Sequence, residues 1–245
     1  MSNATNTVLA ALRKQRPGLL LDVPSGGGPI TRGARELGWR IVEVDLFPRA
    51  DLAGVQADAC APLPFRDASF DSLVSMEGIE HFENQTGFVR ECARVLKPGG
   101  TMILSTPNIL HLSSRVSGFL TGQRLMKHGF INEHSTLRER MGTRLYHGHA
   151  YLIDAFRLRY ILRVVGLELV ELRASSVSIS SALMSPLYGA VWAATSFAIA
   201  SGRKHVESKG RPPPPRAVER ELASVALSPA VLFGKKLVAI ARKTS

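Results

Sequence analysis

The segment MEGIEHFE, residues 76–83, sets two carboxylates and an imidazole close together directly after an apolar run. If this segment begins a helix, Glu77, Glu80 and His81 occupy positions i, i+3 and i+4 and share one face. A carboxylate and an imidazole on one face can remove a proton from a hydroxyl group that binds beside them. Glu80 and His81 are therefore candidates for acid–base catalysis.

The stretch LLDVPSGGGPIT, residues 20–31, indicates a buried strand that runs into a glycine turn. It lacks the lysine and hydroxyl of a P-loop, and Thr31 replaces the third glycine of a dinucleotide loop. S-adenosylmethionine (SAM) has no pyrophosphate that needs backbone N–H donors. A SAM site therefore loses little when Pro24 removes one N–H donor from the turn. Gly26 and Gly28 would let the backbone approach that ligand closely. A plain strand–turn–helix junction is the alternative interpretation.

Three acids stand where the parts of SAM would need them. Asp22 precedes the turn and can meet the ammonium group, while Asp45 ends the next strand and can accept both ribose hydroxyls. Asp58 follows a third strand, where its carboxylate and the Ala59 N–H can contact the adenine. The residues that we expect to bind SAM are Asp22, Ser25, Gly26, Gly28, Asp45, Asp58, Ala59 and Met76.

These residues need a scaffold that brings the ends of several strands together. Short apolar runs bounded by turn signals alternate with helical patterns along the first 110 residues. The expected strands are 18–23, 39–45, 70–76, 100–106, 167–173 and 235–242. The expected helices include one in the stretch 86–100, ended by Pro98 and a glycine pair, and one at 152–165. Alternation of this kind predicts an α/β fold with a parallel sheet covered on both faces. Ligands of such folds bind at the carboxyl ends of the strands.

The order of the motifs resembles the class I SAM-dependent methyltransferases, notably the O-methyltransferases of the ubiquinone pathway and of glycan clusters. D-x-x-x-G-x-G, then VD, LPFRDASFDSLVSMEGIEH and ARVLKPGG carry the resemblance over about residues 18–108. It implies a Rossmann-like, seven-stranded, mostly parallel sheet whose last strand is antiparallel. A lid insertion at 109–148 and an apolar insertion before the last strand would complete the fold. Pro24 departs from the family's usual first glycine.

The resemblance also implies roles for individual residues. The E-x-x-E-H stretch is similar to one that ubiquinone-pathway enzymes link to a divalent metal, so Glu77, Glu80 and His81 are candidate metal ligands. In relatives without metal, the Glu-His pair that corresponds to Glu80 and His81 only shapes the SAM pocket. His149, just ahead of the helix at 152–165, becomes a third catalytic candidate. The STPN stretch resembles that of small-molecule and glycan O-methyltransferases. We therefore expect methylation of oxygen in a glycan, a lipid-linked molecule or a quinone-like small molecule.

Charge is distributed unevenly along the chain. The net charge is +11, residues 174–202 carry no charge, and residues 203–245 hold ten basic and three acidic side chains. We therefore divide the chain into a core at 1–173, an apolar, basic and proline-rich insertion at 174–234, and a final strand at 235–245. The uncharged run is interpreted as an interfacial segment on anionic lipid, as a packed cap or dimer contact, or as a transmembrane helix.

Two cysteines give no disulfide framework, and the N-terminus lacks the basic region of a signal peptide. We therefore expect a cytoplasmic protein, peripheral on the inner face of a membrane, that has no nucleic-acid partner. RNA methylation is an alternative, but it needs stacking aromatics, and these make up only 7% of the chain. A SAM-binding scaffold without turnover is a second alternative. A nicotinamide oxidoreductase ranks last, because it leaves Asp58 without a role.

Overall fold

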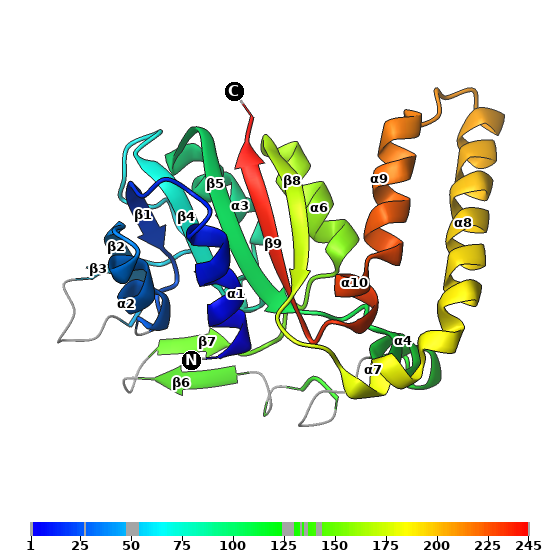
Figure 1. The fold of residues 1–245 in the computed structure, drawn as a ribbon, viewed down its shortest axis with the longest axis horizontal. Helices are drawn as coiled ribbons and strands as arrows, with labels where there is room; N and C mark the ends of the chain where they lie inside the picture. The colour runs from blue at the N-terminus through cyan, green and yellow to red at the C-terminus, as the bar shows by residue number, and fades with distance from the viewer. Residues whose placement is uncertain are drawn as a thin grey trace.

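A seven-stranded sheet forms the centre of the computed structural model, which describes residues 2–26, 28–47, 54–123, 130–132, 134, 137–140 and 144–244 (Figure 1). The order of its strands is β3-β2-β1-β4-β5-β9-β8. Their bounds are β1 (Leu19–Asp22), β2 (Arg40–Asp45), β3 (Val55–Gln56), β4 (Phe70–Met76), β5 (Leu96–Pro107), β8 (Leu167–Ala174) and β9 (Lys236–Lys243).

All neighbouring pairs from β3 to β5 are parallel, whereas β9 lies antiparallel between β5 and β8. The predicted seven-stranded, mostly parallel sheet with an antiparallel last strand is confirmed. The carboxyl ends of β1, β2, β4 and β5 consequently share one edge of the sheet, which is the lower edge in Figure 1. This is the edge that positions the predicted site.

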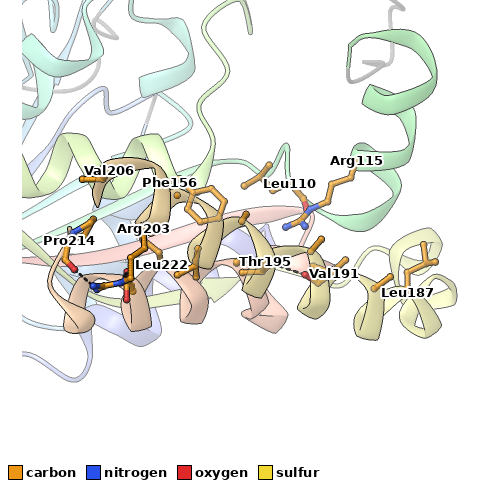
Figure 2. Close-up of a pocket in the computed structure, with 17 residues that line it drawn as sticks. Leu110, Arg115, Phe156, Leu187, Val191, Thr195, Arg203, Val206, Pro214 and Leu222 are labelled. Atoms are coloured by element: carbon orange, nitrogen blue, oxygen red, sulfur yellow. Dashed lines mark hydrogen bonds and ion pairs between the residues drawn. The ribbon is translucent and has the colours of Figure 1, made fainter. Parts of the chain in front are cut away.

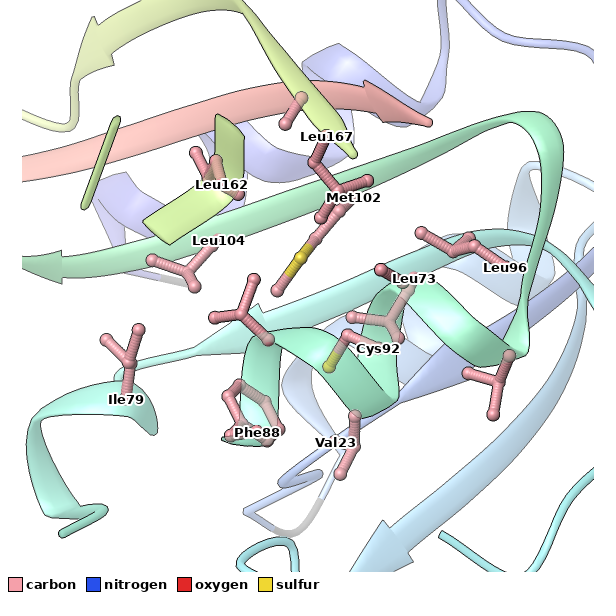
Figure 3. Packing of buried hydrophobic residues seen from close by; sticks show 14 of the residues in the cluster. Val23, Leu73, Ile79, Phe88, Cys92, Leu96, Met102, Leu104, Leu162 and Leu167 are labelled. Atoms are coloured by element: carbon pink, nitrogen blue, oxygen red, sulfur yellow. The ribbon is translucent and has the colours of Figure 1, made fainter. Parts of the chain in front are cut away.

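The apolar runs became central strands because both of their faces are buried. Leu20 and Leu21 are neighbours in β1, yet they belong to two different hydrophobic clusters on opposite faces of the sheet. Met102 and Leu104 of β5 lie in one cluster, and Ile103 between them lies in the other. Figure 3 shows Met102 and Leu104 facing Phe88 and Cys92.

Helices cover both faces. α1 (Asn3–Leu12) and α2 (Pro29–Glu36) bury Val8, Leu12 and Ile30 against the Leu20 face. α3 (Gln85–Val95) and α6 (Ala155–Val164) cover the opposite face (Figure 1). The sequence analysis did not predict α1, whose amino end is capped by the Ser2 hydroxyl, which accepts a hydrogen bond from the Thr5 N–H.

The helix predicted in the stretch 86–100, ended by Pro98 and the glycine pair, is wrong at its carboxyl end. α3 ends at Val95, and Leu96 already begins β5, where it pairs with Phe70 of β4. Pro98 contributes to this early end, because a proline disfavours helical geometry in the residue before it. The motif LKPGG is therefore the start of a strand rather than the end of a helix.

The insertion before the last strand is helical rather than a linker. It contains α7 (Ile179–Leu183), the 3₁₀ turn η2 (Ser185–Leu187), α8 (Tyr188–Ser208), α9 (Arg216–Leu227) and α10 (Pro229–Phe233). Residues 203–208, expected in a polar linker, continue α8, and the prolines at 212–215 form the turn into α9. Among the described helices, none is both long and apolar enough to cross a membrane.

The predicted lid at 109–148 contains α4 (Leu112–Thr121) and a hairpin of β6 (Leu137–Arg140) and β7 (Arg144–His147). Residues 124–129, 133, 135–136 and 141–143 of this segment lie outside the described residues. Figure 1 shows the hairpin below the carboxyl edge of the sheet. A lid that covers the acceptor would have to lie at this edge of the sheet.

Candidate functional site

A cavity of about 650 Å³ opens at the carboxyl ends of β1 to β4. Its walls come from the glycine turn, the end of β2, the segment after β3 and the segment after β4. The lining residues are Val23, Pro24, Gly26, Val44, Asp45, Leu46, Phe47, Ala57, Asp58, Ala59, Cys60, Met76, Glu77, His81, Phe82, Glu83 and Asn84. The volume suits a small ligand with apolar and polar parts.

The turn between β1 and α2 is held by backbone hydrogen bonds to its neighbours. The Val23 N–H donates to Val74 O at 3.0 Å, and the Ser25 N–H donates to Val44 O at 2.9 Å. Gly26 has a φ of +56°, and a Cβ added there would meet no atom within 4 Å. The turn therefore exposes backbone to the cavity at Gly26, at an angle that favours glycine.

Gly28 lies at the amino end of α2 with a φ of +85°. Pro24 lines the cavity without filling it, and its ring packs so closely against Gly78 that a side chain at Gly78 would overlap it. The departure from the usual first glycine is thus accommodated by a glycine on the neighbouring segment.

Asp45 at the end of β2 has both carboxylate oxygens in use. Its Oδ2 accepts a hydrogen bond from the Gly26 N–H at 2.9 Å, and its Oδ1 accepts one from the Phe47 N–H at 2.8 Å. Each carboxylate oxygen can accept a second hydrogen bond. The carboxylate is therefore held in a fixed orientation in the cavity wall, where it can still accept two ligand hydroxyls.

Asp58 and Ala59 follow β3 on the cavity wall. The Asp58 Oδ1 accepts a hydrogen bond from the Cys60 N–H at 2.8 Å, which fixes this carboxylate as well. Partial desolvation, and next the charge of Asp58, raises the pKa of the Cys60 thiol to about 11, although the residue is exposed to solvent. Met76 at the end of β4 adds an apolar surface to the same cavity.

Asp22, Ser25 and Gly28, all expected to bind SAM, are not among the residues that line the cavity. Asp22 is 1% exposed, and its Oδ2 accepts a hydrogen bond from the Thr31 hydroxyl of α2 at 3.3 Å. Burial, followed by the charge of Glu43, raises the pKa of Asp22 well above its ordinary value. The acid therefore lies beneath the glycine turn rather than on its surface, and contact with an ammonium group stays a prediction.

The segment after β4 does not begin a helix at Glu77, so this expectation is wrong. The only helical turn there is the 3₁₀ turn η1 (Ile79–His81), and Glu77 stands outside it with a φ of +50°. Glu77 instead forms an ion pair of 2.7 Å with Lys236 Nζ and accepts a hydrogen bond from the Ser105 hydroxyl at 3.0 Å. Its carboxylate is thus directed toward β5 and β9.

Glu80 is fully buried behind the cavity wall. Its Oε2 accepts a hydrogen bond from the Thr106 hydroxyl at 3.2 Å, while its Oε1 lies 4.0 Å from Nε2 of His149. Burial, and next the charge of Glu77, raises the pKa of Glu80 to about 8. The carboxyl group is therefore largely protonated at neutral pH, which makes it a poor base there.

His81 and His149 bring two imidazole rings together beside Glu80. Their ring centroids are 5.0 Å apart, in an edge-to-face arrangement, and His81 lines the cavity. One ligand atom of each of Glu80, His81 and His149 lies within 4.8 Å of the others. Two imidazoles and a carboxylate are ligands that a divalent transition metal accepts. In this group His149, rather than Glu77, accompanies Glu80 and His81.

Several residues of the site were missed by the sequence analysis. Phe47, Phe82 and Asn84 line the cavity, and each stands within three residues of a predicted site residue, which was the only available signal. Lys236 carried no local signal, because its pairing with Glu77 depends on how β9 enters the sheet.

Asn108 of the STPN stretch has a structural contact. Its side-chain NH₂ donates to the carbonyl oxygens of Val231 at 2.8 Å and Gly234 at 2.7 Å. It thereby joins the end of β5 to α10.

Comparison with known proteins agrees with this geometry. The sequence family described as "Methyltransferase domain" matches residues 21–104. The ubiquinone biosynthesis O-methyltransferase of Xanthomonas oryzae pv. oryzae (strain PXO99A) is 34% identical over 102 residues, which cover 36% of this chain and 43% of that protein. The chain thus matches less than half the length of this curated relative.

Two solved structures share the fold at low sequence identity. The 1,6-didemethyltoxoflavin-N1-methyltransferase of Burkholderia thailandensis, solved with S-adenosylhomocysteine, has a TM-score of 0.53 and 16% identity, covering 99% of this chain and 79% of its own. The [4+2]-cyclase SpnF has a TM-score of 0.52 and 19% identity, covering 99% and 80%. Because these neighbours are named for different reactions, the fold alone does not define the chemistry. Residues 21–104 therefore match the methyltransferase domain family, and the seven-stranded sheet has the fold that these solved structures share.

Proposed function

We propose that this protein transfers the methyl group of SAM to an oxygen atom of a small acceptor molecule. The observation that carries the proposal is the cavity that brings Gly26, Asp45 and Asp58 together and reaches His81. The relatives named as ubiquinone biosynthesis O-methyltransferases support oxygen as the methylated atom. Acceptors in keeping with them are quinone-like small molecules, glycans or lipid-linked sugars.

The residues of the cavity fit the parts of SAM. Asp45 would accept the two ribose hydroxyls, since its oxygens are oriented by Gly26 and Phe47 and keep free lone pairs. Asp58 and the Ala59 N–H would contact the adenine ring, which Met76 and Phe82 would flank. The methionine end would lie along Gly26 at the mouth of the glycine turn.

When bound, SAM supplies a methyl group on a positively charged sulfur atom. The residues of this chain hold the acceptor oxygen in line with that methyl group and exclude water. His81, on the cavity wall, would accept the proton of the acceptor hydroxyl. His149, packed against His81 and 4.0 Å from Glu80, would hold that imidazole in place. A divalent cation on Glu80, His81 and His149 would instead bind the acceptor oxygen directly.

Calorimetry of the purified full chain tests the first half of the proposal. SAM and S-adenosylhomocysteine should bind, and NADH should not, because the glycine turn is not a complete dinucleotide loop for a pyrophosphate. Transfer of labelled methyl to a panel of catechols, hydroquinones and sugar lipids tests the second half. His81→Ala should keep SAM binding and lose transfer. Binding without transfer to any acceptor would favour the scaffold alternative.

We further infer that the protein works at the cytoplasmic face of a membrane. The exposed side chains of Trp192 and Phe197 on α8 support this location, as does the basic segment after residue 203. Sedimentation with liposomes that contain anionic lipid tests it. The pelleted fraction should fall in the double variant Trp192→Ser, Phe197→Ser, and an unchanged fraction would contradict the inference.

A further inference from the structure

The helical insertion encloses a second cavity, which the proposed chemistry does not use. It has a volume of about 890 Å³ and lies between α8 and α9, with Phe156 of α6 and Leu110 on the side toward the sheet (Figure 2). No residue of α8 is buried, so this helix stands over an open groove. The α8 residues on the groove are mostly small, including Ala190, Ala194 and Ala198, and they leave it unfilled.

The length and lining of the groove suit an extended apolar chain. Its lining begins at Leu187 of η2 and follows α8 from Ala190 to Val206, over which a helix rises roughly 24 Å. The other wall carries Leu222 and Ala226 of α9. Thr195, the one hydroxyl of this lining, donates to Val191 O at 2.7 Å. The hydroxyl group of the lining is therefore already hydrogen-bonded, and a bound apolar chain would not leave it without a partner.

Charge is balanced at one end of the groove and unbalanced at the other. At the far end, Arg203 donates to Glu219 at 2.7 Å and to Pro214 O at 2.9 Å (Figure 2). At the near end, Arg115 of α4 donates its Nε–H to Leu110 O at 2.7 Å. Within the part of the chain that the structure describes, no carboxylate pairs with Arg115. This half-buried guanidinium therefore has N–H donors left for an anion.

The Arg115 end of the groove lies at the same edge of the sheet as the reaction site. α4 is the first helix after β5. Near the end of β5, the Thr106 hydroxyl donates a hydrogen bond to the Glu80 carboxyl group. In Figure 1, α4 and the start of α8 lie at the carboxyl edge of the sheet, whereas α8 ends at the opposite edge. A molecule whose apolar chain filled the groove would thus have its polar end at the edge of the sheet that also holds Glu80, His81 and His149.

We propose that this groove binds the apolar chain of an acidic lipid, with the acid group on Arg115. The binding site follows from the groove itself. The further statement, that this lipid is the acceptor or carries it, rests on the proposed function. The acceptor is then an amphipathic anion whose methylated hydroxyl lies close to its acid group.

Binding of the fluorescent fatty acid cis-parinaric acid to the full chain tests the site. Fluorescence should rise to saturation at one molecule per chain, and straight-chain fatty acids should displace the probe. Each added methylene should strengthen displacement by roughly fourfold until the groove is full. Absence of saturable binding would overturn the proposal.

Paired variants locate the bound chain. Ala194 lines the groove and its neighbour Ala193 does not, although both are exposed residues of α8. Ala194→Phe should abolish or strongly weaken probe binding, and Ala193→Phe should leave it unchanged. Equal effects of the two variants would contradict the assigned groove. Dissociation of a dimer by Ala194→Phe would show that a second copy covers the groove and would also overturn the proposal.

A second pair tests the acid group. Arg115→Gln should weaken binding of a fatty acid by roughly tenfold or more and leave binding of the matching fatty alcohol unchanged. Arg220→Gln, on the exposed side of α9, is the control. Equal loss for acid and alcohol would refute the role of Arg115. SAM calorimetry on the same samples separates the proposals, because failure of SAM binding with intact lipid binding refutes the methyltransferase function alone.

Discussion

Asp45 and Gly26 are joined by a hydrogen bond of 2.9 Å, in which the carboxylate of the ribose candidate accepts from the backbone of the glycine turn. The bond links the end of β2 to the turn after β1, which are 19 residues apart. The predicted acid and the predicted turn are therefore one structural unit. The orientation of the carboxylate is set before a ligand arrives, which lowers the ordering cost of binding.

Replacing Asp45 should weaken SAM binding in two graded steps. Asp45→Asn keeps one oxygen acceptor but loses the charge, so the dissociation constant should rise severalfold. Asp45→Ala removes both acceptors and releases Gly26, so the dissociation constant should rise at least about tenfold. Calorimetry measures both, with exposed Glu36→Ala as control. Unchanged affinity in Asp45→Ala would remove this residue from the site.

Glu77 and Ala68 have similar backbone strain in different places. Their φ values are +50° and +51°, a region that costs a side chain about 1–2 kcal/mol. Ala68→Gly should raise the free energy of unfolding by up to about 1 kcal/mol and leave SAM binding unchanged. Glu77→Gly gains the same relief but loses the ion pair with Lys236, which fixes one wall of the cavity.

We therefore expect Glu77→Gly to weaken SAM binding severalfold without a gain in stability. Urea unfolding and calorimetry on the two variants make the comparison. If Glu77→Gly behaved like Ala68→Gly in both measurements, the strain at Glu77 would have no functional role.

Cys60 reports occupancy of the cavity without any need for an acceptor. Its thiol lines the cavity and has a pKa of about 11, so at neutral pH its thiolate fraction is about a hundredfold below that of an ordinary thiol. Alkylation should accordingly be slow, accelerate with rising pH, and be faster in Asp58→Asn. Saturating S-adenosylhomocysteine should block it.

Mass spectrometry of the alkylated chain follows each cysteine separately. Cys92 is fully buried and serves as the internal control, since it should stay unmodified until the protein unfolds. Alkylation of Cys60 at the same rate with and without S-adenosylhomocysteine would place the ligand elsewhere.

The strands were predictable because their signal is local. Leu20 and Leu21 are apolar neighbours, and only a strand buried on both faces places both in hydrophobic clusters. The acids Asp45 and Asp58 were predictable for a related reason, since the end of a strand fixes where the next residues lie. Leu96, by contrast, follows the end of α3 and pairs with Phe70 of a distant strand. Pro98 is a local signal for a helix end, but it does not reveal that pairing.

The same limit applies to the residues around the reaction site. Glu77 and Glu80 were predicted to share a helical face, but Lys236 and Ser105 from other strands hold Glu77 in a different direction. The uncharged run at 174–202 had the composition of a lipid-facing segment. Its composition could not show that its helix pairs with α9 and encloses a groove.

Asp22 should make stability depend on pH in a defined direction. Because the pKa of this carboxyl is raised in the fold, the folded state holds its proton more tightly than the unfolded state does. The stabilisation is complete below the ordinary pKa and is lost as pH rises through the interval up to the raised value. Asp22→Asn keeps an acceptor for the Thr31 hydroxyl and cannot ionise.

Urea unfolding from about pH 4 to about pH 8 tests this expectation. The variant and the wild type should have similar stability at the acid end, and the variant should be increasingly more stable toward neutral pH. Glu43 and Asp45 face the same group and stay in place in both proteins. A stability difference that did not change with pH would show that Asp22 is ionised in the fold.

Asn108 should be important for stability and not for binding SAM. It is fully buried, and its side-chain NH₂ faces the carbonyl oxygens of Ala230, Val231 and Gly234. Asn108→Ala leaves these buried acceptors without their donor and should cost about 2–4 kcal/mol in the free energy of unfolding. Asn108→Asp, of nearly the same shape, replaces the donor with a charge facing three carbonyl oxygens and should cost at least as much.

Both variants should bind SAM normally at a temperature where they remain folded, because Asn108 does not line the SAM cavity. They should also loosen α10 and with it the base of α9, one wall of the apolar groove. Probe binding in the groove should therefore weaken while SAM affinity persists. Loss of SAM affinity in the folded Asn108→Ala protein would show that this asparagine acts on the cofactor site instead.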